Sequence, residues 1–314
     1  MPDPLVVVDA DVLGRNRTGD ETYTENLLRS LPPLAEGLRL AAVTRRPDLV
    51  PPGIEPVALG TRSQELRMAV TLPRLLRRLR PALGHFQHAL PLGLRAPAVL
   101  TIHDLSFERD ASLMGRRDRL TFRAVVPRSV RRAARVLAVS ERTRADLVEL
   151  YGTPPEKIVV TPNGVDPAFA PGDVDGDRYL LFVGAIQERK DPLAAADAAA
   201  AVGLPLVVVG PEKEPALARE LERRGARLHG YVSKPELAGL YRGAAALLLP
   251  SRYEGFGLPV LEAMASGTPV VAAPEPALRE VAGDAAIYAE PGTLPDAVRR
   301  ALAERDRLRA AGLE

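Results

Sequence analysis

Short apolar runs, three to five residues long, recur along the chain and alternate with segments of helical periodicity. Runs that are apolar at every position are typical of strands buried on both faces, and intervening helices are typical of a parallel sheet. The predicted strands are Leu5–Val8, Leu40–Val43, Ala98–Ile102, Val136–Val139, Ile158–Thr161, Tyr179–Val183, Leu206–Val209, Ala245–Leu249 and Val270–Ala272. The pattern therefore predicts an α/β protein with doubly wound, Rossmann-like parallel sheets.

A turn-rich stretch divides these strands into two groups. Residues 167–177 are dominated by proline, glycine and aspartate, and they follow Asn163-Gly164. Such composition is typical of interdomain linkers, and 314 residues suffice for about two domains. We predict an N-terminal domain over residues 1–166, a linker over 167–177 and a C-terminal domain over 178–314. Ligands of such sheets bind beyond the carboxyl ends of the strands, so we expect the functional residues there, in a cleft between the domains.

The amino-acid composition excludes several kinds of site and cellular location. The net charge is +2, which predicts no strong global field, and hydrophobic residues make up 46% of the chain, enough for two cores. The absence of cysteine excludes disulfides, thiolate metal sites and a cysteine nucleophile. The N-terminal Met-Pro-Asp-Pro-Leu lacks the features of a signal peptide, and no apolar run reaches the length of a membrane span. We therefore expect a soluble, cytoplasmic protein.

The segment Glu254-Gly-Phe-Gly-Leu-Pro-Val-Leu-Glu262 combines two carboxylates, two glycines and a helix start. We predict a loop up to Gly257 and a helix that opens at Pro259, because proline at the first helical position loses no hydrogen bond. Glycines let the backbone approach a ligand, and the free N–H groups of a helix N-terminus suit a phosphate. The glutamates are better suited to accept hydrogen bonds from hydroxyls. A nucleotide sugar offers both groups, whereas the alternative is an ordinary strand–loop–helix corner with solvated glutamates.

Two cations follow the predicted strand Tyr179–Val183. The chain continues as Gly184-Ala-Ile-Gln-Glu-Arg189-Lys190-Asp191-Pro192, in which Asp191 is a predicted helix N-cap and Pro192 the first helical residue. Arg189 and Lys190 therefore come just before a helix N-terminus, a position suited to a diphosphate. The alternative interpretation is a pair of solvated cations.

Two further segments follow predicted strands, and a third lies in a loop beyond the end of strand Leu206–Val209. Strand Ala98–Ile102 ends in His103-Asp104, a titratable pair at the predicted cleft, although a single histidine also occurs in purely structural settings. The first strand is followed by a loop with Gly19 and Tyr23 and then by an amphipathic helix, so this loop is either a binding loop or a plain turn. The segment Leu228–Val232 is a candidate contact for a nucleotide base.

Taken together, these residues resemble the family-4 glycosyltransferases of the GT-B fold, from the first strand to about Arg300. The most specific segments are Val183-Gly184, Glu188-Arg-Lys-Asp191, Pro250–Ala265, Gly267-Thr-Pro-Val-Val, Val139–Thr143 and Asn163-Gly-Val-Asp166. The resemblance implies retaining transfer of a sugar from a nucleotide-diphosphate sugar to an acceptor hydroxyl. It also implies that the reaction requires no metal and no other cofactor.

The resemblance also implies roles for single residues. Glu262 would bind the donor ribose hydroxyls, and Glu254 would hold the sugar ring with the backbone of Phe256 and Gly257. The diphosphate would be neutralised by Arg189 and Lys190 and by the backbone near Leu258. Stabilising this departing group is the main requirement for catalysis by such an enzyme. His103 would lie beside the transferred sugar. The predicted catalytic residues are thus His103, Arg189, Lys190 and Glu254. The predicted donor-binding residues are Gly184, Arg189, Lys190, Glu254, Phe256, Gly257, Leu258, Glu262 and Val232. The acceptor-side loop contributes Gly19 and Tyr23.

Two features depart from the family pattern. The first loop usually carries a paired glycine followed by Arg-Tyr, but here Glu21 and Thr22 replace the second glycine and the arginine, while Gly19 and Tyr23 match. This predicts a difference on the acceptor side. Family members also usually carry a last helix that crosses back to the N-terminal domain, and the chain ends at Leu313-Glu314. We therefore expect this crossover helix to be missing.

Other charged segments are better explained by structure than by a binding function. Asp9-Ala-Asp11 fits a plain turn, and Asp173-Val-Asp-Gly-Asp177 lacks the downstream glutamate of a calcium loop, so we predict no metal site. The basic stretches Pro73–Arg80 and Arg116–Arg135 predict helices with solvated arginines and with Leu72, Leu75, Leu76 and Leu79 in the core. The alternative is peripheral contact with the inner face of a membrane. Nucleic acid is excluded as a partner, because no aromatic residues are interleaved with these arginines.

The function predicted from the sequence is a retaining, metal-independent glycosyltransferase that uses a nucleotide-diphosphate sugar, with mannose as the suggested sugar. The acceptor is a glycan, a lipid-linked or a small-molecule hydroxyl. Two alternatives remain open: a GT-B epimerase of nucleotide sugars, and a non-catalytic, membrane-associated protein that binds sugar nucleotides.

Overall fold

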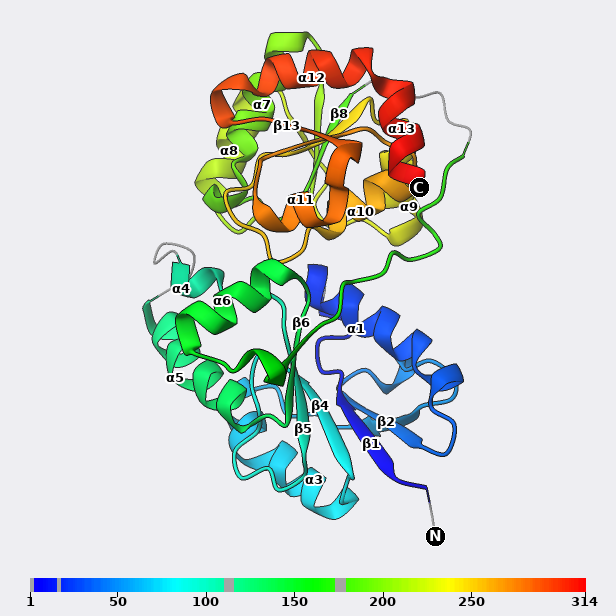
Figure 1. The fold of residues 1–314 in the computed structure, drawn as a ribbon, viewed down its shortest axis with the longest axis vertical. Coiled ribbons are helices and arrows are strands. Elements are labelled where there is room, and N and C mark those ends of the chain that lie inside the picture. Colours follow the sequence, from blue (N-terminus) through cyan, green and yellow to red (C-terminus); the bar gives the residue numbers. More distant parts are fainter. Residues whose placement is uncertain (1–2, 16–17, 110–115, 173–178) are drawn as a thin grey trace. The chain divides into compact units, whose positions relative to one another are not determined.

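The computed structural model describes residues 3–15, 18–109, 116–172 and 179–314, and the chain forms two compact units, Met1–Asn163 and Gly164–Glu314 (Figure 1). The division comes three residues before the predicted end of the N-terminal domain at residue 166. Phe169, inside the predicted linker, is buried in the hydrophobic core of the second unit. Residues 173–177 of that linker lie outside the described residues.

In the described part of the first unit, a seven-stranded parallel sheet has the order β3-β2-β1-β4-β5-β6-β7. Its strands are β1 (Leu5–Asp9), β2 (Arg39–Thr44), β3 (Glu55–Ala58), β4 (Leu83–Gln87), β5 (Ala98–Ile102), β6 (Arg135–Ala138) and β7 (Ile158–Val160). Its helices are α1 (Thr18–Ser30), α2 (Gln64–Leu66), α3 (Leu72–Leu79), α4 (Ser106–Arg109), α5 (Arg116–Arg132) and α6 (Glu141–Tyr151). Leu28 of α1 belongs to one hydrophobic cluster, and Leu76 of α3 and Val126 of α5 belong to another.

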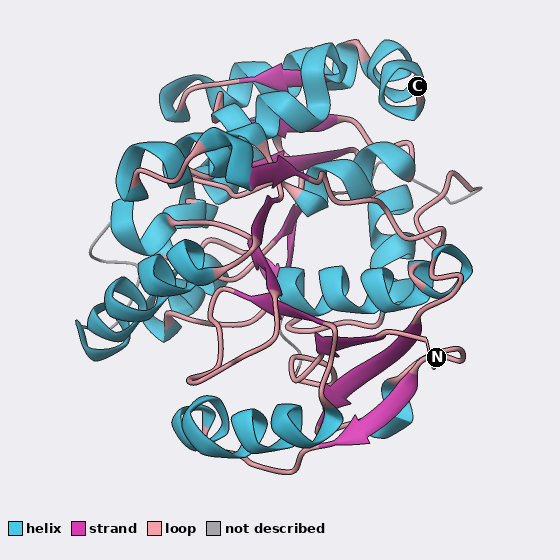
Figure 2. Cartoon of the chain, turned by 60° about the horizontal axis from the view of Figure 1, so that its bottom comes forward, coloured by secondary structure: helices cyan, strands magenta, loops and turns pink. Residues whose placement is uncertain are grey.

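In the described part of the second unit, a six-stranded parallel sheet has the order β10-β9-β8-β11-β12-β13. Its strands are β8 (Leu180–Val183), β9 (Leu206–Val209), β10 (Arg227–Leu228), β11 (Ala246–Leu249), β12 (Val270–Ala272) and β13 (Ala286–Tyr288). Its helices are α7 (Pro192–Val202), α8 (Pro215–Arg223), α9 (Lys234–Gly243), α10 (Leu258–Ala265), α11 (Pro276–Ala282), α12 (Leu294–Ala303) and α13 (Arg305–Leu313). Helices cover both faces of this sheet (Figure 2). One hydrophobic cluster includes residues of α7, α8 and α12, and the other includes residues of α9, α10 and α11.

All nine predicted strands are present within one residue of their predicted bounds, and the described residues form four further strands that were not predicted. Two of these lack a continuous run of strand-forming apolar residues, because β3 contains the polar Glu55 and the proline Pro56, and β4 contains the polar His85 and Gln87. Strand β10 has only two residues and β13 three, so neither forms an apolar run that stands out in the sequence. The missed β4 matters most, because it lies in the middle of its sheet beside β1 and β5.

The strand order of each sheet reverses direction at one point. In the first unit this point lies between β1 and β4, and in the second unit it lies between β8 and β11. The loops that leave two such strands run to opposite faces of the sheet, which leaves a crevice at the carboxyl edge where ligands of doubly wound proteins bind. Each unit therefore has its own place at which functional side chains are expected.

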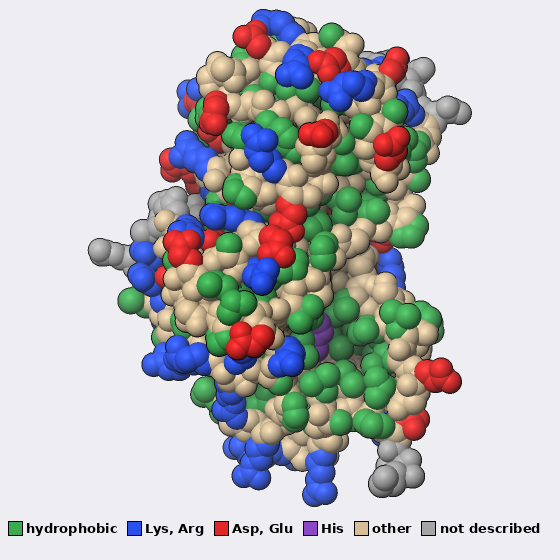
Figure 3. All heavy atoms as spheres, in the orientation of Figure 1, with side chains coloured by type: hydrophobic (Ala, Val, Ile, Leu, Met, Phe, Trp, Pro, Cys, Tyr) green, Lys and Arg blue, Asp and Glu red, His purple; other side chains and the backbone are tan. Residues whose placement is uncertain are grey.

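The basic helix α3 has the predicted arrangement of side chains. Leu72 and Leu76 are buried, and Leu75 and Leu79 pack against the same cluster. Its arginines are exposed: Arg74, Arg77 and Arg78. Figure 3 shows basic side chains at the lower end of the view, where Figure 1 places α3. Among the described residues, no helix is both long and apolar enough to cross a membrane.

Candidate functional site

Lys190, in the loop after β8, contacts Glu254, in the loop after β11. The Lys190 Nζ donates a hydrogen bond to Glu254 Oε1 at 2.6 Å, and the two residues are only 9% and 6% exposed. The backbone N–H of Arg252 also donates to the carbonyl oxygen of Arg189 at 2.9 Å, which ties the two loops together. Lys190 comes just before α7, whose N-cap is Asp191, as predicted. These residues thus lie at the carboxyl edge of the second sheet, where its strand order reverses.

Arg189 completes this group, which we call the lysine–glutamate cluster (Arg189, Lys190 and Glu254). The Arg189 guanidinium donates to the backbone oxygen of Tyr253 and lies 3.7 Å from Glu254 Oε2. Burial alone would raise the pKa of Glu254, but Lys190 and Arg189 outweigh it and hold that pKa below its usual value. The carboxylate is therefore ionised, and the cluster carries two positive charges against one negative charge.

The start of α10 borders this cluster. The helix begins at Leu258, one residue before the predicted start at Pro259, so Pro259 is its second residue. Gly257 is the N-cap, with φ of +110° and no side chain to cap the helix. A Cβ atom at Gly257 would lie 2.7 Å from a terminal methyl group of Leu278, which would have to shift, and the positive φ by itself favours glycine. Phe256, just before it, is 8% exposed.

Glu262 lies one turn inside α10 and is 7% exposed. The hydroxyl of Tyr241, a fully buried residue of α9, donates a hydrogen bond to Glu262 Oε2 at 2.8 Å. Burial raises the pKa of Glu262 to about 7, although the bond from Tyr241 and the charge of Lys234 both lower it. Val232, the candidate base contact, is half-buried and packs against the hydrophobic cluster that contains Tyr241.

Gly184 is the last of the candidate donor-binding residues, and its backbone lies against that of Gly210. A Cβ atom at Gly210 would lie 2.1 Å from the carbonyl oxygen of Gly184, so only glycine fits at the end of β9. Gly210 has φ of +143°, which also favours glycine. This glycine lets the loop with Arg189 and Lys190 turn over the neighbouring strand end.

In the first unit, His103 follows β5 directly, as predicted. Its Nε2 is 2.8 Å from Gln87 Oε1, and its ring meets that of Tyr23 edge-on with 4.8 Å between centroids. Gln87 in turn donates to Thr24 Oγ1 at 2.6 Å. Burial lowers the pKa of His103 to about 4, which keeps the ring neutral near pH 7. Sequence reasoning missed Gln87, because β4 was not predicted.

A second histidine, His85, lies behind this group. Its Nε2 is 2.7 Å from Thr101 Oγ1, and the Tyr23 hydroxyl is 2.9 Å from the same oxygen. Burial lowers the pKa of His85 to about 4 as well. Tyr23 therefore connects the first helix of this unit with the end of β5.

The loop predicted to hold Gly19 and Tyr23 is shorter than expected. Helix α1 begins at Thr18, so both residues lie in its first two turns and not in a loop. The acidic Asp20 and Glu21 occupy the first turn, where a helix favours negative charge. The glycine therefore marks the start of a helix, while Tyr23 reaches the strand ends from the helix.

The aspartates of Asp9-Ala-Asp11 are paired with arginines. Asp9 accepts two hydrogen bonds from Arg67, at 3.0 Å and 2.5 Å, and Arg67 is 1% exposed. Asp11 accepts from Arg45 at 3.1 Å and lies 3.5 Å from Arg67. A buried guanidinium needs such partners, so these carboxylates have a structural explanation.

Two family models match the chain side by side. The model described as Glycosyltransferase Family 4 matches residues 17–169, and the model described as Glycosyl transferases group 1 matches residues 177–304. A curated relative is the O-antigen chain mannosyltransferase B of Escherichia coli, which is 31% identical over 219 residues, 62% of this chain and 57% of the relative. The chain spans less than two thirds of the length of the first curated relatives it matches.

Solved structures resemble the whole chain. An Anabaena protein in complex with UDP and glucose superposes with a TM-score of 0.74 at 15% identity, over 99% of this chain and 93% of that one. WaaG, a glycosyltransferase involved in lipopolysaccharide biosynthesis, gives 0.73 at 19% identity, over 98% and 94%. At these identities the likeness shows the fold alone, and the predicted GT-B fold of two Rossmann-like domains is confirmed.

Proposed function

This chain belongs to the family-4 glycosyltransferases, and from that premise we propose that it transfers a sugar from a nucleotide-diphosphate sugar to an acceptor hydroxyl. The observation that carries the proposal is the lysine–glutamate cluster beside the start of α10, at the point where the second sheet reverses its strand order. A nucleotide sugar needs cations for its phosphates and carboxylates for its hydroxyls, and this unit offers both.

The departing diphosphate is the main electrostatic demand of the reaction. Negative charge grows on the leaving oxygen, and fixed cations that already face it stabilise the transition state. Lys190 uses one of its three N–H bonds on Glu254, so two remain for a phosphate. Glu254, held in place by Lys190, is then positioned to accept hydrogen bonds from the sugar.

Several finer features belong to the same proposal. The positive charge of Arg189 and Lys190 and the uncapped start of α10 would do the work that Mg²⁺ does in other nucleotide-sugar enzymes, so we propose catalysis without a metal. The family resemblance supports retention of the anomeric configuration, and we assign no nucleophile. Neutral His103 would contact the transferred sugar.

The suggested donor sugar is mannose. Support comes from the family resemblance and from the O-antigen mannosyltransferase among the relatives. The acceptor would be a glycan, a lipid-linked or a small-molecule hydroxyl. The exposed arginines of α3, which are Arg74, Arg77 and Arg78, favour peripheral contact of a cytoplasmic protein with the inner face of a membrane.

A thermal-shift screen of nucleotide sugars tests the proposal, followed by donor hydrolysis and transfer assays with any compound that binds. We expect stabilisation by one or a few nucleotide-diphosphate sugars and slow release of nucleoside diphosphate without an acceptor. Conversion of the donor to its epimer, without transfer, would favour the epimerase instead. Donor binding without any turnover, together with salt-sensitive binding to anionic liposomes, would favour the non-catalytic binder.

A further inference from the structure

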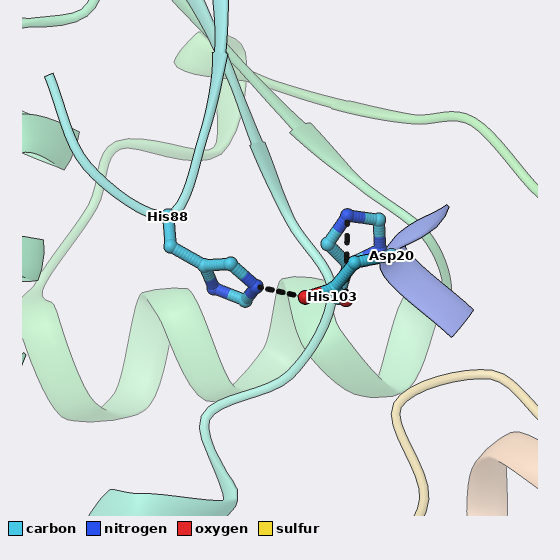
Figure 4. A group of neighbouring side chains, drawn as sticks. All are labelled: Asp20, His88 and His103. Carbon is cyan, nitrogen blue, oxygen red and sulfur yellow. Dashed lines mark ion pairs between the residues drawn. The ribbon is translucent and has the colours of Figure 1, made fainter. Parts of the chain in front are cut away.

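Two histidines and an aspartate converge in the first unit. We call Asp20, His88 and His103 the histidine cluster (Figure 4). Asp20 comes from α1, His88 follows β4 and His103 follows β5, so three separate elements supply the three side chains. The His88 Nε2 is 3.9 Å from Asp20 Oδ2, and the His103 Nε2 is 4.0 Å from Asp20 Oδ1.

These spacings are close to those of a metal site. Zn²⁺ binds imidazole nitrogen and carboxylate oxygen at roughly 2.0–2.2 Å, which puts the ligand atoms of a tetrahedral site about 3.3 Å apart. All three ligand atoms of the histidine cluster lie within 4.8 Å of one another. Movements of up to about 0.8 Å at each side chain would bring them into coordination distance, and rotation about side-chain torsions supplies such movements.

The backbone at His88 supports a ligand site. His88 has φ of +57°, a left-handed conformation that costs a side-chain-bearing residue on the order of 1–2 kcal/mol. Its backbone N–H donates to the carbonyl oxygen of Thr101 at 2.9 Å, which fixes this conformation beside β5. Strained residues of this kind gather at ligand sites, where the fold holds a side chain in place against its own preference.

Gln87 offers a fourth ligand. Its carbonyl oxygen lies 2.8 Å from the His103 Nε2, and its amide nitrogen is held by Thr24. When the proton of the His103 ring moves from Nε2 to Nδ1, the Nε2 lone pair can bind a metal, the hydrogen bond to Gln87 is lost, and the carbonyl oxygen is then free to turn to the metal. Two imidazoles, one carboxylate and one amide oxygen form a ligand set suited to Zn²⁺.

We propose that Asp20, His88 and His103 form a binding site for a divalent transition-metal ion, with Zn²⁺ as the preferred ion. The ion would act as an inhibitor and not as a cofactor, because the leaving group is neutralised by residues of the second unit. It would occupy the Nε2 of His103, the group that the proposed function places beside the transferred sugar. This inhibitory effect rests on the proposed function, whereas the binding of the ion does not.

Calorimetric titration of the full chain with Zn²⁺, after removal of metals by a chelator and exchange into chelator-free buffer, tests the site. We expect one saturable site per chain and visible absorption bands of a protein-bound ion when Co²⁺ is used instead. His88→Gln and Asp20→Asn should each weaken binding by at least about tenfold. His229→Gln is the matched control, since His229 is exposed and lies in the second unit, and it should bind Zn²⁺ like the wild type.

The proposal is overturned if no saturable binding occurs, or if both cluster variants bind as tightly as the wild type. Loss of binding in His229→Gln would also overturn it. If His88→Gln does not fold, as judged by circular dichroism, Asp20→Asn alone decides, because Asp20 is 40% exposed at the side chain and removal of its charge leaves the core intact.

A transfer assay separates this inference from the proposed function. Zn²⁺ should inhibit the wild type at the concentrations at which it binds, and His88→Gln should need at least about tenfold more Zn²⁺ for the same inhibition. Binding without inhibition would retain the metal site and contradict the role of His103 in transfer. Normal transfer in a chain that binds no Zn²⁺ would retain the proposed function and contradict the metal site.

Discussion

Glu262 shows how one buried carboxyl group can serve a ligand. It has a single hydrogen bond of 2.8 Å from Tyr241 among the contacts described, and it lies one turn inside the helix that begins at the candidate phosphate site. We expect Glu262→Ala to weaken donor binding by about 1–3 kcal/mol, the usual cost of deleting a buried polar partner. Titration calorimetry with the donor found in the screen measures this, and wild-type affinity in the folded variant would contradict it.

The raised pKa of Glu262 predicts a dependence of stability on pH. Burial moves this pKa from 4.5 to about 7, so the folded protein holds a proton that the unfolded chain releases. The resulting stabilisation is fully present below pH 4.5 and is lost as the pH rises to about 7. Relative to Glu262→Gln, which does not titrate, the wild type should lose about 3 kcal/mol of unfolding free energy across this range. Urea unfolding of both proteins at pH 5, 6, 7 and 8 checks it, and parallel curves would disprove the assignment.

At the scale of elements, the loops after β8 and β11 are joined through the buried pair Lys190 and Glu254. Glu254→Ala leaves the Lys190 ammonium buried without its partner, so we expect a loss of about 3–5 kcal/mol in unfolding free energy. Lys190→Ala should also destabilise the fold, and it should lower kcat by about 10²-fold with a smaller effect on donor affinity. The double variant Lys190→Ala/Glu254→Gln carries neither charge.

This double variant separates the two roles of the pair. Because Lys190 and Glu254 are removed together, and Arg189 keeps its hydrogen bond to the backbone oxygen of Tyr253, the stability of the double variant should recover toward that of the wild type, while its kcat should stay low. Urea unfolding and steady-state kinetics on the same preparations measure both quantities. Wild-type kcat in the double variant would show that Lys190 has a structural role only.

The ends of β8 and β9 approach each other too closely for any side chain at Gly210. In Gly210→Ala the new methyl group would lie 2.1 Å from the Gly184 oxygen, so the loop with Arg189 and Lys190 must move. We expect a loss of at least about 2 kcal/mol, from the clash and from the positive φ together. Gly203→Ala is the control, because Gly203 has φ of +73° but nothing within 4 Å of a Cβ atom. Equal losses in thermal unfolding would mean that backbone strain, and not the close approach, is what matters.

For the whole molecule, the proposed division of chemistry between the two units predicts the response to metals. Cationic side chains of the second unit neutralise the leaving group, so activity should survive EDTA, and Mg²⁺ or Mn²⁺ should change the rate only modestly. Zn²⁺ should instead inhibit through the histidine cluster of the first unit. Loss of all turnover in EDTA, restored by one divalent ion, would mean that a metal holds the diphosphate.

Local sequence patterns predicted a large part of this protein. Apolar runs identified most of the strands that are buried on both faces, since most side chains of such a strand are apolar. Asp191-Pro192 predicted the N-terminus of α7, because capping depends on neighbouring residues only. The motif residues Arg189, Lys190, Glu254 and Glu262 were proposed as site residues for the same reason: each lies in a short segment whose pattern can be read without its partners.

Only the tertiary structure decided which side chains meet. Strand β4 contains His85 and Gln87, so its periodicity did not reveal it, and it is the pairing with β1 and β5 that makes it a strand. Lys190 and Glu254 are 64 residues apart, and the ends of β8 and β11 bring them to 2.6 Å. Asp20, His88 and His103 converge because parallel strands carry their following residues to one edge of the sheet. Burial, and with it the raised pKa of Glu262, likewise depends on residues distant in the chain, which no local pattern contains.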